Sequence, residues 1–246
     1  MEKKNIVLWS GGKDSSATII LCHELGIKID EIIMAEVMFC NKRNISGENP
    51  LHMKFVYEEA IPKFEEWGYK TTIIRGEVDY LSHFYHIIEN PRVHIENKGM
   101  HYGFPCGKQC SIRRDCKVVP IAKYLKGLEC SITEFCGIAA DEEKRLLSMQ
   151  LRGQRSILAE QGYREDMAHQ LCADYGLLSP TYDLSKRGGC WMCPFARREE
   201  HEYMKEHYPK VWEEFVALEE VENVANPKWN VFKETLRERD LLLECN

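Results

Sequence analysis

The sequence has no apolar run that approaches the ~18 residues of a membrane-spanning helix, so we expect no membrane association. Its first residues lead into a strand pattern rather than the apolar core of a signal peptide, and we therefore expect a cytoplasmic protein. Basic residues are not in excess either, because 33 Lys and Arg against 39 Asp and Glu give a formal net charge of −6. This balance argues against a wholly basic nucleic-acid binder, although a local basic patch is compatible with it.

What is present is the composition of an ordinary globular protein, with 44% apolar and 29% charged residues over 246 positions. Strand patterns and helical patterns alternate along the first part of the chain. Strands are predicted at residues 5–9, 31–38, 70–75 and 128–138, and helices at residues 14–25, 51–67, 118–126 and 142–150. This order predicts an α/β fold, a doubly wound and mostly parallel sheet with helices on both faces.

From residue 179 the pattern changes to a loop followed by charged helices near residues 197–207, 211–221 and 231–243. We therefore predict two domains. Residues 1–178 would form a nucleotide-binding α/β domain, and residues 179–246 a Cys-x-x-Cys loop with a small helical C-terminal appendage.

The segment Ser-Gly-Gly-Lys-Asp-Ser at residues 10–15 follows an apolar, β-branched run and precedes a helical pattern. Two glycines allow a tight turn whose N–H groups can approach a ligand, and a helix N-terminus attracts anions. Asp14, Ser15 and Ser16 are candidates for capping that helix. The patterns G-x-x-x-x-G-K-[ST] and G-x-G-x-x-G are both absent, so we expect a phosphate site of another kind. A glycine turn that only joins a strand to a helix is the alternative.

Eleven cysteines are many for a chain without an export signal, which favours metal or redox chemistry over disulfides. Five of them lie inside apolar patterns, where free cysteine usually acts as a small buried hydrophobe. These are Cys22, Cys40, Cys130, Cys136 and Cys172. Five others lie in glycine-rich or charged segments and are the functional candidates. These are Cys106, Cys110, Cys116, Cys190 and Cys193.

Cys190 and Cys193 form a C-x-x-C pair, a spacing that lets two thiolates reach one metal from a tight turn. A pair supplies half of a four-thiolate site, and we select Cys110 and Cys116 as the other half, with Cys106 in reserve. Four thiolates fit a [4Fe-4S] cluster or Zn²⁺, and the sequence does not separate the two. A redox-active dithiol is the third alternative.

Residues 10–15 resemble the SGGxDS signature of the PP-loop ATP pyrophosphatase superfamily, and most of the chain, from residue 5 to about residue 200, resembles the phosphoadenosine phosphosulfate (PAPS) reductase family within it. Three further segments carry the resemblance. Residues 110–121 contain a cysteine and Lys-x-x-Pro, residues 137–145 are close to G-I-R-x-D-E-x-x-R, and residues 190–194 contain the C-x-x-C pair. The resemblance implies a sheet of the adenine nucleotide alpha hydrolase type.

The superfamily cleaves ATP between its α and β phosphates, with Mg²⁺, and adenylates a substrate. The second strand ends near Glu36, which we expect to form a wall for adenosine. The residues expected to contact the nucleotide are Ser10, Gly11, Gly12, Lys13, Asp14, Ser15, Ser16 and Glu36. Those expected to act in catalysis are Lys13, Asp14, Lys117 and Arg145. Asp14 would either hold Mg²⁺ or cap the helix. For Lys117 and Arg145, the alternative to a catalytic role is that they are ordinary solvated surface residues.

Relatives that combine ATP with an iron–sulfur cluster insert sulfur into tRNA or DNA, which implies a sulfur donor protein and a nucleic-acid acceptor as partners. Reductases proper have a degenerate loop and a Glu-Cys-Gly-x-His tail, whereas this loop is intact and the chain ends Glu-Cys-Asn. Ala139 also stands where the family usually has arginine. These departures favour an ATP-consuming enzyme. An adenylyl-sulfate (APS/PAPS) reductase, and a nucleotide-binding subunit with structural zinc that needs a partner chain or an oligomer, remain alternatives.

Overall fold

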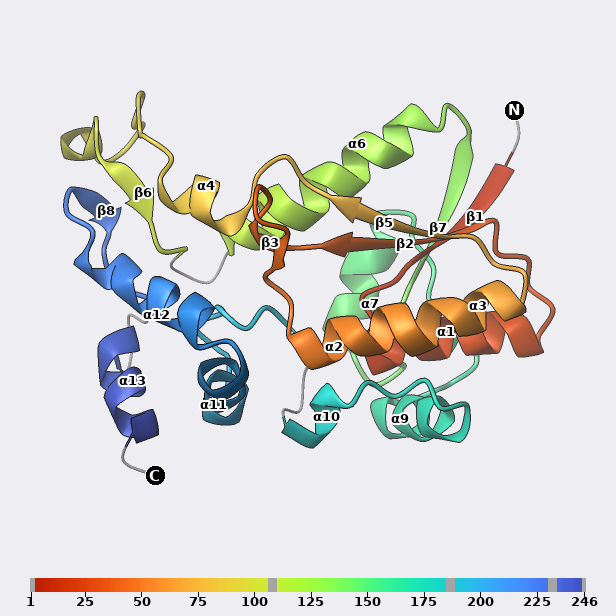
Figure 1. Cartoon of the computed structure of the whole chain (residues 1–246). Coiled ribbons are helices and arrows are strands. Elements are labelled where there is room, and N and C mark those ends of the chain that lie inside the picture. Colours follow the sequence, from red (N-terminus) through yellow and green to blue (C-terminus); the bar gives the residue numbers. More distant parts are fainter. Residues whose placement is uncertain (1–2, 106–109, 185–188, 230–233, 245–246) are drawn as a thin grey trace. The chain divides into compact units, whose positions relative to one another are not determined.

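The computed structural model describes residues 3–105, 110–184, 189–229 and 234–244 (Figure 1). The chain divides into two compact units. Unit 1 comprises Met1–Ala35, Pro50–Ile74 and Ile121–Gly188. Unit 2 comprises Glu36–Asn49, Arg75–Pro120 and Gly189–Asn246. Because the chain passes between the units after residues 35, 49, 74, 120 and 188, a single boundary at residue 178 does not describe this division.

The sheet of unit 1 has four strands in the order β5 (Thr71–Arg75), β2 (Glu31–Glu36), β1 (Lys3–Leu8) and β7 (Ser131–Cys136). Strand β1 pairs in parallel with both β2 and β7, with Val7 opposite Ile32 on one side and Phe135 on the other. The strands alternate with helices along the chain, as crossover connections require. The predicted α/β fold with a mostly parallel sheet is therefore confirmed.

Helices cover both faces of this sheet, with α1 and α3 on one face and α6 on the other (Figure 1). The helices of unit 1 are α1 (Lys13–Glu24), α2 (Pro50–Phe55), α3 (Ile61–Glu66), α6 (Val119–Gly127, whose first two residues belong to unit 2), α7 (Glu143–Gln150), α8 (Ile157–Glu160), α9 (Glu165–Asp174) and α10 (Thr181–Leu184). A π-helical turn, Val56–Ala60, joins α2 to α3. Together the three elements form the continuous helical segment that was predicted at residues 51–67.

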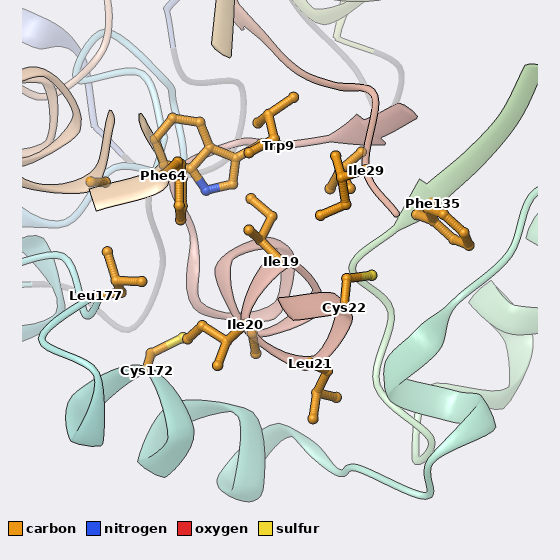
Figure 2. Close-up of a cluster of buried hydrophobic side chains, with 14 of the residues drawn as sticks. Trp9, Ile19, Ile20, Leu21, Cys22, Ile29, Phe64, Phe135, Cys172 and Leu177 are labelled. Atoms are coloured by element: carbon orange, nitrogen blue, oxygen red, sulfur yellow. The ribbon is translucent and has the colours of Figure 1, made fainter. Parts of the chain in front are cut away.

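The core of unit 1 lies around α1 (Figure 2). Ile19, Ile20 and Cys22 of this helix are fully buried. Trp9, at the end of β1, packs edge-on against Phe64 with ring centroids 5.1 Å apart. Its indole N–H donates to the Oγ of Ser16 at 2.9 Å, so the strand and the start of α1 are fixed to each other.

Unit 2 contains two small sheets and shorter helices. Strand β3 (Met38–Cys40) pairs antiparallel with β4 (Ile45–Ser46), and β6 (His101–Gly103) pairs in parallel with β8 (Val224–Asn226). The helices are α4 (Tyr80–Phe84), α5 (Ser111–Arg113), α11 (Arg198–His207), α12 (Pro209–Ala217) and α13 (Leu236–Glu244). Shorter turns are Ile95–Asn97, Leu218–Glu220 (both 3₁₀) and Arg114–Val118 (π).

The C-terminal helices were expected to form an appendage, but they share a core with the middle of the chain. Trp191, Trp212 and Phe215 pack in one cluster with Phe39 and Tyr80. This shared burial is why residues 189–246 belong with earlier segments rather than stand apart. No helix among the residues that the structure describes is long and apolar enough to cross a membrane.

Candidate nucleotide and metal sites

The glycine loop, residues 10–15, connects β1 to α1 as the sequence predicts. The hydroxyls of Ser10 and Ser15 lie 3.1 Å apart, and the Ser15 Oγ also donates to the carbonyl of Gly12 at 2.9 Å. Helix α1 begins at Lys13 with Gly12 as its N-cap, and within the described chain no side chain caps it. The expectation that Asp14, Ser15 or Ser16 caps α1 is therefore wrong. At this helix start the N–H of Gly12 donates to the Oγ of Ser10 and that of Lys13 to Tyr182, which leaves the N–H groups of Asp14 and Ser15 to face an anion.

Gly11 has a structural reason to be glycine. Its φ of +75° is left-handed, and an added Cβ would lie 2.4 Å from the imidazole of His52. His52, on α2, is buried, and its two ring nitrogens lie 2.9 Å from the Oγ of Ser179 and 3.0 Å from the carbonyl oxygen of Ser10. Sequence reasoning missed His52, because a lone histidine in a helical pattern carries no signal of its own.

Lys13 and Asp14 form an ion pair at 2.8 Å, and Lys13 also reaches Glu165 of α9 at 3.1 Å. Burial lowers the pKa of Lys13, but the two carboxylates outweigh it and the net pKa lies above its ordinary value. For Asp14, burial is the main cause that raises its pKa; Lys13 opposes the rise, while Glu142 and Glu165 add to it. Lys13 thus contacts the two carboxylates of Asp14 and Glu165, and Glu142 adds a third negative charge that acts on Asp14.

The segment 137–145 packs against the same loop. A Cβ on Gly137 would lie 2.4 Å from the backbone nitrogen of Ser15, so glycine permits this close approach. Arg145, predicted as a catalytic cation, forms an ion pair with Glu142 and has a largely exposed side chain. The Glu142 carboxylate also accepts from the N–H of Ala139 at 3.2 Å, which places this family-like segment in the electrostatic surroundings of Asp14.

Tyr182 adds a contact that the sequence did not indicate. Its hydroxyl accepts a hydrogen bond from the backbone N–H of Lys13 at 2.9 Å. A tyrosine near a helix start gives no pattern that could have revealed this role.

Glu36, expected to line the adenosine site, is the last residue of β2 and belongs to unit 2. Its carboxylate is buried and accepts from the Nε of Arg75 at 2.8 Å. Its role as a wall for adenosine stays a prediction.

The C-x-x-C pair forms a tight turn in unit 2. The N–H of Cys193 donates to the carbonyl of Cys190 at 3.1 Å, and the two residues between them, Trp191 and Met192, are buried. Trp191 donates from its backbone N–H to Gly47 at 3.1 Å, which fixes the turn against the β3–β4 region. The turn is therefore held by its own buried residues and presents two thiols on a rigid support.

Cys110 and Cys116 belong to the same unit. Cys110 is the exposed N-cap of α5, whereas Cys116 is buried in the core and burial raises its pKa to about 12. Cys110 interacts electrostatically with both Cys116 and Cys190. Among the described residues, no group of three or more His, Cys, Asp or Glu side chains is arranged to hold a metal ion. Cys106, the reserve ligand, lies outside the described residues.

Lys117, predicted as a catalytic cation, pairs with Glu48 at 2.7 Å in unit 2. Burial lowers the pKa of Lys117, but the carboxylate of Glu48 outweighs it and the net pKa is raised. The other oxygen of Glu48 lies 3.9 Å from the Sγ of Cys190. Burial, and then Glu48, raise the pKa of the Cys190 thiol, while Lys117 opposes them. The structure thus places this lysine beside the cysteines.

Tyr80 belongs to the same unit as these cysteines and has a buried hydroxyl. Its hydroxyl is fully buried and has no hydrogen-bond partner within the described part of the chain. Burial is the main cause that raises the pKa of Tyr80, and the electrostatic influence of Cys110, Cys193 and Cys190 adds to it. A buried donor without an acceptor is costly, and cluster sulfides or metal-bound thiolates are acceptors. The Tyr80 hydroxyl is thus a buried donor that an added acceptor would satisfy, while the described cysteines are not gathered into a metal site.

Comparison with known proteins gives distant similarities. No protein-family profile matches the chain. An uncharacterized protein, MJ0066, of Methanocaldococcus jannaschii is 24% identical over an alignment 230 positions long, which covers 87% of this chain and 41% of that protein's length. Among solved structures, the chain is similar to the U34-tRNA thiolase NcsA from Methanococcus maripaludis with its [4Fe-4S] cluster. The identity is 16%, the TM-score is 0.40, and the match covers 98% of this chain and 72% of that one.

Proposed function

We propose that this chain binds ATP at the glycine loop and cleaves it between the α and β phosphates to adenylate a substrate for sulfur transfer. The observation that carries the proposal is the loop itself. Gly11 and Gly137 allow close backbone approach, and an uncapped helix start follows, with Lys13 in its first turn. The resemblance of this segment to the PP-loop signature supports ATP rather than another anion, and the segments at residues 110–121, 137–145 and 190–194 support a relation to the PAPS reductase family.

In the proposed reaction, an oxygen of the acceptor attacks the α phosphorus, the bond to the bridging oxygen breaks, and pyrophosphate leaves with the bonding electrons. Backbone N–H groups of the loop and the ammonium of Lys13 would stabilise this developing charge. Mg²⁺ that arrives with ATP would meet Asp14, whose pKa is raised first by burial and then by Glu142 and Glu165. A sulfur nucleophile from a donor protein then displaces AMP from the adenylated acceptor, for which tRNA or DNA is the candidate.

The cysteines of unit 2 would hold a [4Fe-4S] cluster, with Cys110, Cys190 and Cys193 as three of the ligands. When bound, such a cluster supplies iron that can hold a sulfur atom or carry an electron. Glu48 and Lys117 would set the charge around Cys190, and the Tyr80 hydroxyl would donate to a sulfur. Cys116 is the fourth candidate ligand, and its buried thiol would have to lose its proton on binding.

The test is pyrophosphate release from ATP by the anaerobically purified chain, with and without a nucleic-acid acceptor. Lys13→Met should lower the rate of release at least tenfold, since it removes the cation from the loop. Lys63→Met is the matched control because Lys63 lies on the exposed face of α3, and it should leave the rate unchanged. Sulfite release from an adenylyl sulfate without pyrophosphate would instead establish the reductase alternative.

Iron, sulfide and zinc measured on the same sample decide the metal. About four iron and four sulfide per chain would support cluster-assisted sulfur transfer. One zinc without iron would contradict the cluster and favour the nucleotide-binding subunit with a structural metal.

A further inference from the structure

A cavity of about 640 Å³ opens in unit 2, between α4, the segment that follows it, β6 and the π-helical turn at Arg114–Val118. Its lining includes none of the described residues assigned above to the nucleotide or to a metal. Cavities of this volume suit small organic molecules. The site is therefore independent of the proposed ATP chemistry.

His83 of α4 lines this cavity and is 7% exposed. Its Nε2 lies 3.8 Å from a carboxylate oxygen of Asp115, and its Nδ1 has no hydrogen-bond partner among the residues the structure describes. Burial lowers the pKa of His83, so the ring is neutral and carries one N–H. The nearby carboxylate favours that proton on Nε2, which leaves the Nδ1 lone pair as an unfilled acceptor. A ligand with an N–H or O–H donor would satisfy it.

The charge of the lining is negative. Glu77, Glu89 and Asp115 contribute three carboxylates, and Arg114 contributes one cation, so the formal charges of these four groups sum to −2. The guanidinium of Arg114 already donates to both carboxylate oxygens of Asp115, at 2.7 and 2.8 Å. An anionic guest would face uncompensated carboxylates, whereas a cation would be attracted.

The remaining wall is apolar and aromatic. Val78 and Ile88 line the cavity, and the ring of Tyr102 packs edge-on against His83 with centroids 4.6 Å apart. A bare inorganic cation is not favoured here, since within the described chain no three suitable side chains converge on a metal position. An organic body would contact these apolar walls, and a tyrosine ring also attracts cations.

We propose that this cavity is a binding site for a small organic amine, whose ammonium group donates to the Nδ1 of His83 and lies among the carboxylates. Its apolar body rests against Tyr102, Val78 and Ile88.

The test uses tyramine and its carboxylate counterpart, 3-(4-hydroxyphenyl)propionate, which share an aromatic body and differ in the sign of the charge. Isothermal titration of the full chain should show one saturable site for tyramine, with a Kd on the order of 1 mM or tighter, and no binding of the carboxylate. His83→Phe keeps a buried ring without the acceptor and should weaken tyramine at least tenfold. Glu89→Gln, at an exposed position, should weaken it about twofold to threefold.

Glu206→Gln is the matched control. It removes the same charge from the exposed face of α11, at a residue that does not line the cavity. It should leave tyramine affinity unchanged. Thermal unfolding shows whether His83→Phe is folded. If His83→Phe does not fold, the tyramine affinity of Glu89→Gln, a change at an exposed position, decides the test. Absence of tyramine binding, equal binding of the carboxylate, or wild-type affinity in folded His83→Phe or in Glu89→Gln would each overturn the proposal.

Discussion

The glycine loop of unit 1 and the cysteine region of unit 2 satisfy their polar groups in different ways. In the loop, Ser10, Ser15 and Lys13 all bind partners within the same unit. In the cysteine region, the Tyr80 hydroxyl is buried without a partner in the described chain, and the Cys116 thiol is buried with a pKa raised to about 12. These side chains of the first region have partners within the described chain, whereas the second region contains a buried hydroxyl without one.

This difference separates two kinds of preorganisation. In the loop the hydroxyls of Ser10 and Ser15 contact each other and Lys13 pairs with carboxylates, so the proposed binding of ATP would exchange partners and little of the fold would depend on it. A buried donor without an acceptor costs stability, so the metal binding proposed for unit 2 would be coupled to its folding. The following experiments test this contrast, from the largest expected effect to the smallest.

Cys190→Ala and Cys193→Ala should each reduce bound metal from the wild-type content to near zero, because the turn supplies two ligands on one rigid support. Metal analysis after anaerobic purification measures this. Cys130→Ala is the control, since Cys130 precedes β7 in unit 1 and should leave the content unchanged. Full metal content in both turn variants would refute the ligand assignment.

Lys117→Met should destabilise the protein by about 3 kcal/mol, because it leaves Glu48 buried and unneutralised. Adding Glu48→Gln should restore most of that loss. The control in unit 1 is Lys70→Met. It removes the ion pair between Glu31 and a lysine that is 65% exposed, and it should lower the free energy of unfolding by less than about 1 kcal/mol. Thermal unfolding measures all four proteins, and equal losses for the two lysines would contradict the contrast between the regions.

Gly11→Ala should cost about 2 kcal/mol more than Gly26→Ala. Both glycines have positive φ, +75° and +64°, but only at Gly11 does an added Cβ meet a neighbour, the imidazole of His52. Gly11→Ala should also weaken ATP binding, which a titration with ATP measures. If the two variants were equally stable and bound ATP equally, the loop would not be the tight structure described.

Tyr80→Phe should have the smallest effect, and its sign should depend on metal. Without metal the variant should be as stable as the wild type or up to about 1 kcal/mol more stable, since an unpartnered buried hydroxyl is removed. With metal it should lose about that amount. Tyr124→Phe removes a hydroxyl that donates to Glu31 at 2.7 Å, and it should destabilise both forms. A loss in the metal-free Tyr80→Phe variant would show that the hydroxyl has a partner.

The elements that sequence predicted best depend on local patterns. The alternating strands and helices of unit 1, and the glycine loop between β1 and α1, follow from apolar runs and two glycines within a few residues. The C-terminal helices were also placed within a few residues of α11 and α12. Their membership in unit 2 was not predictable, because the burial of Trp191 against Phe39 joins residues far apart in the chain.

The candidate site shows the same limit. Lys117 was identified from a local motif, but its partner Glu48 lies 69 residues earlier and stands in no pattern. His52 and Tyr182 likewise reach the loop only through the fold. Single polar residues that act through long-range contacts leave no periodic trace in the sequence.

The interleaving of the two units has a consequence for synthesis on the ribosome. Unit 2 is synthesised as three separate segments of the chain. The last segment, Gly189–Asn246, contains the C-x-x-C turn and three tryptophans of the core of unit 2. The thiols of Cys110 and Cys116 are therefore translated well before the residues that bury their surroundings. Contacts between such distant segments form late, so a nascent chain has reactive cysteines before it has a complete unit around them.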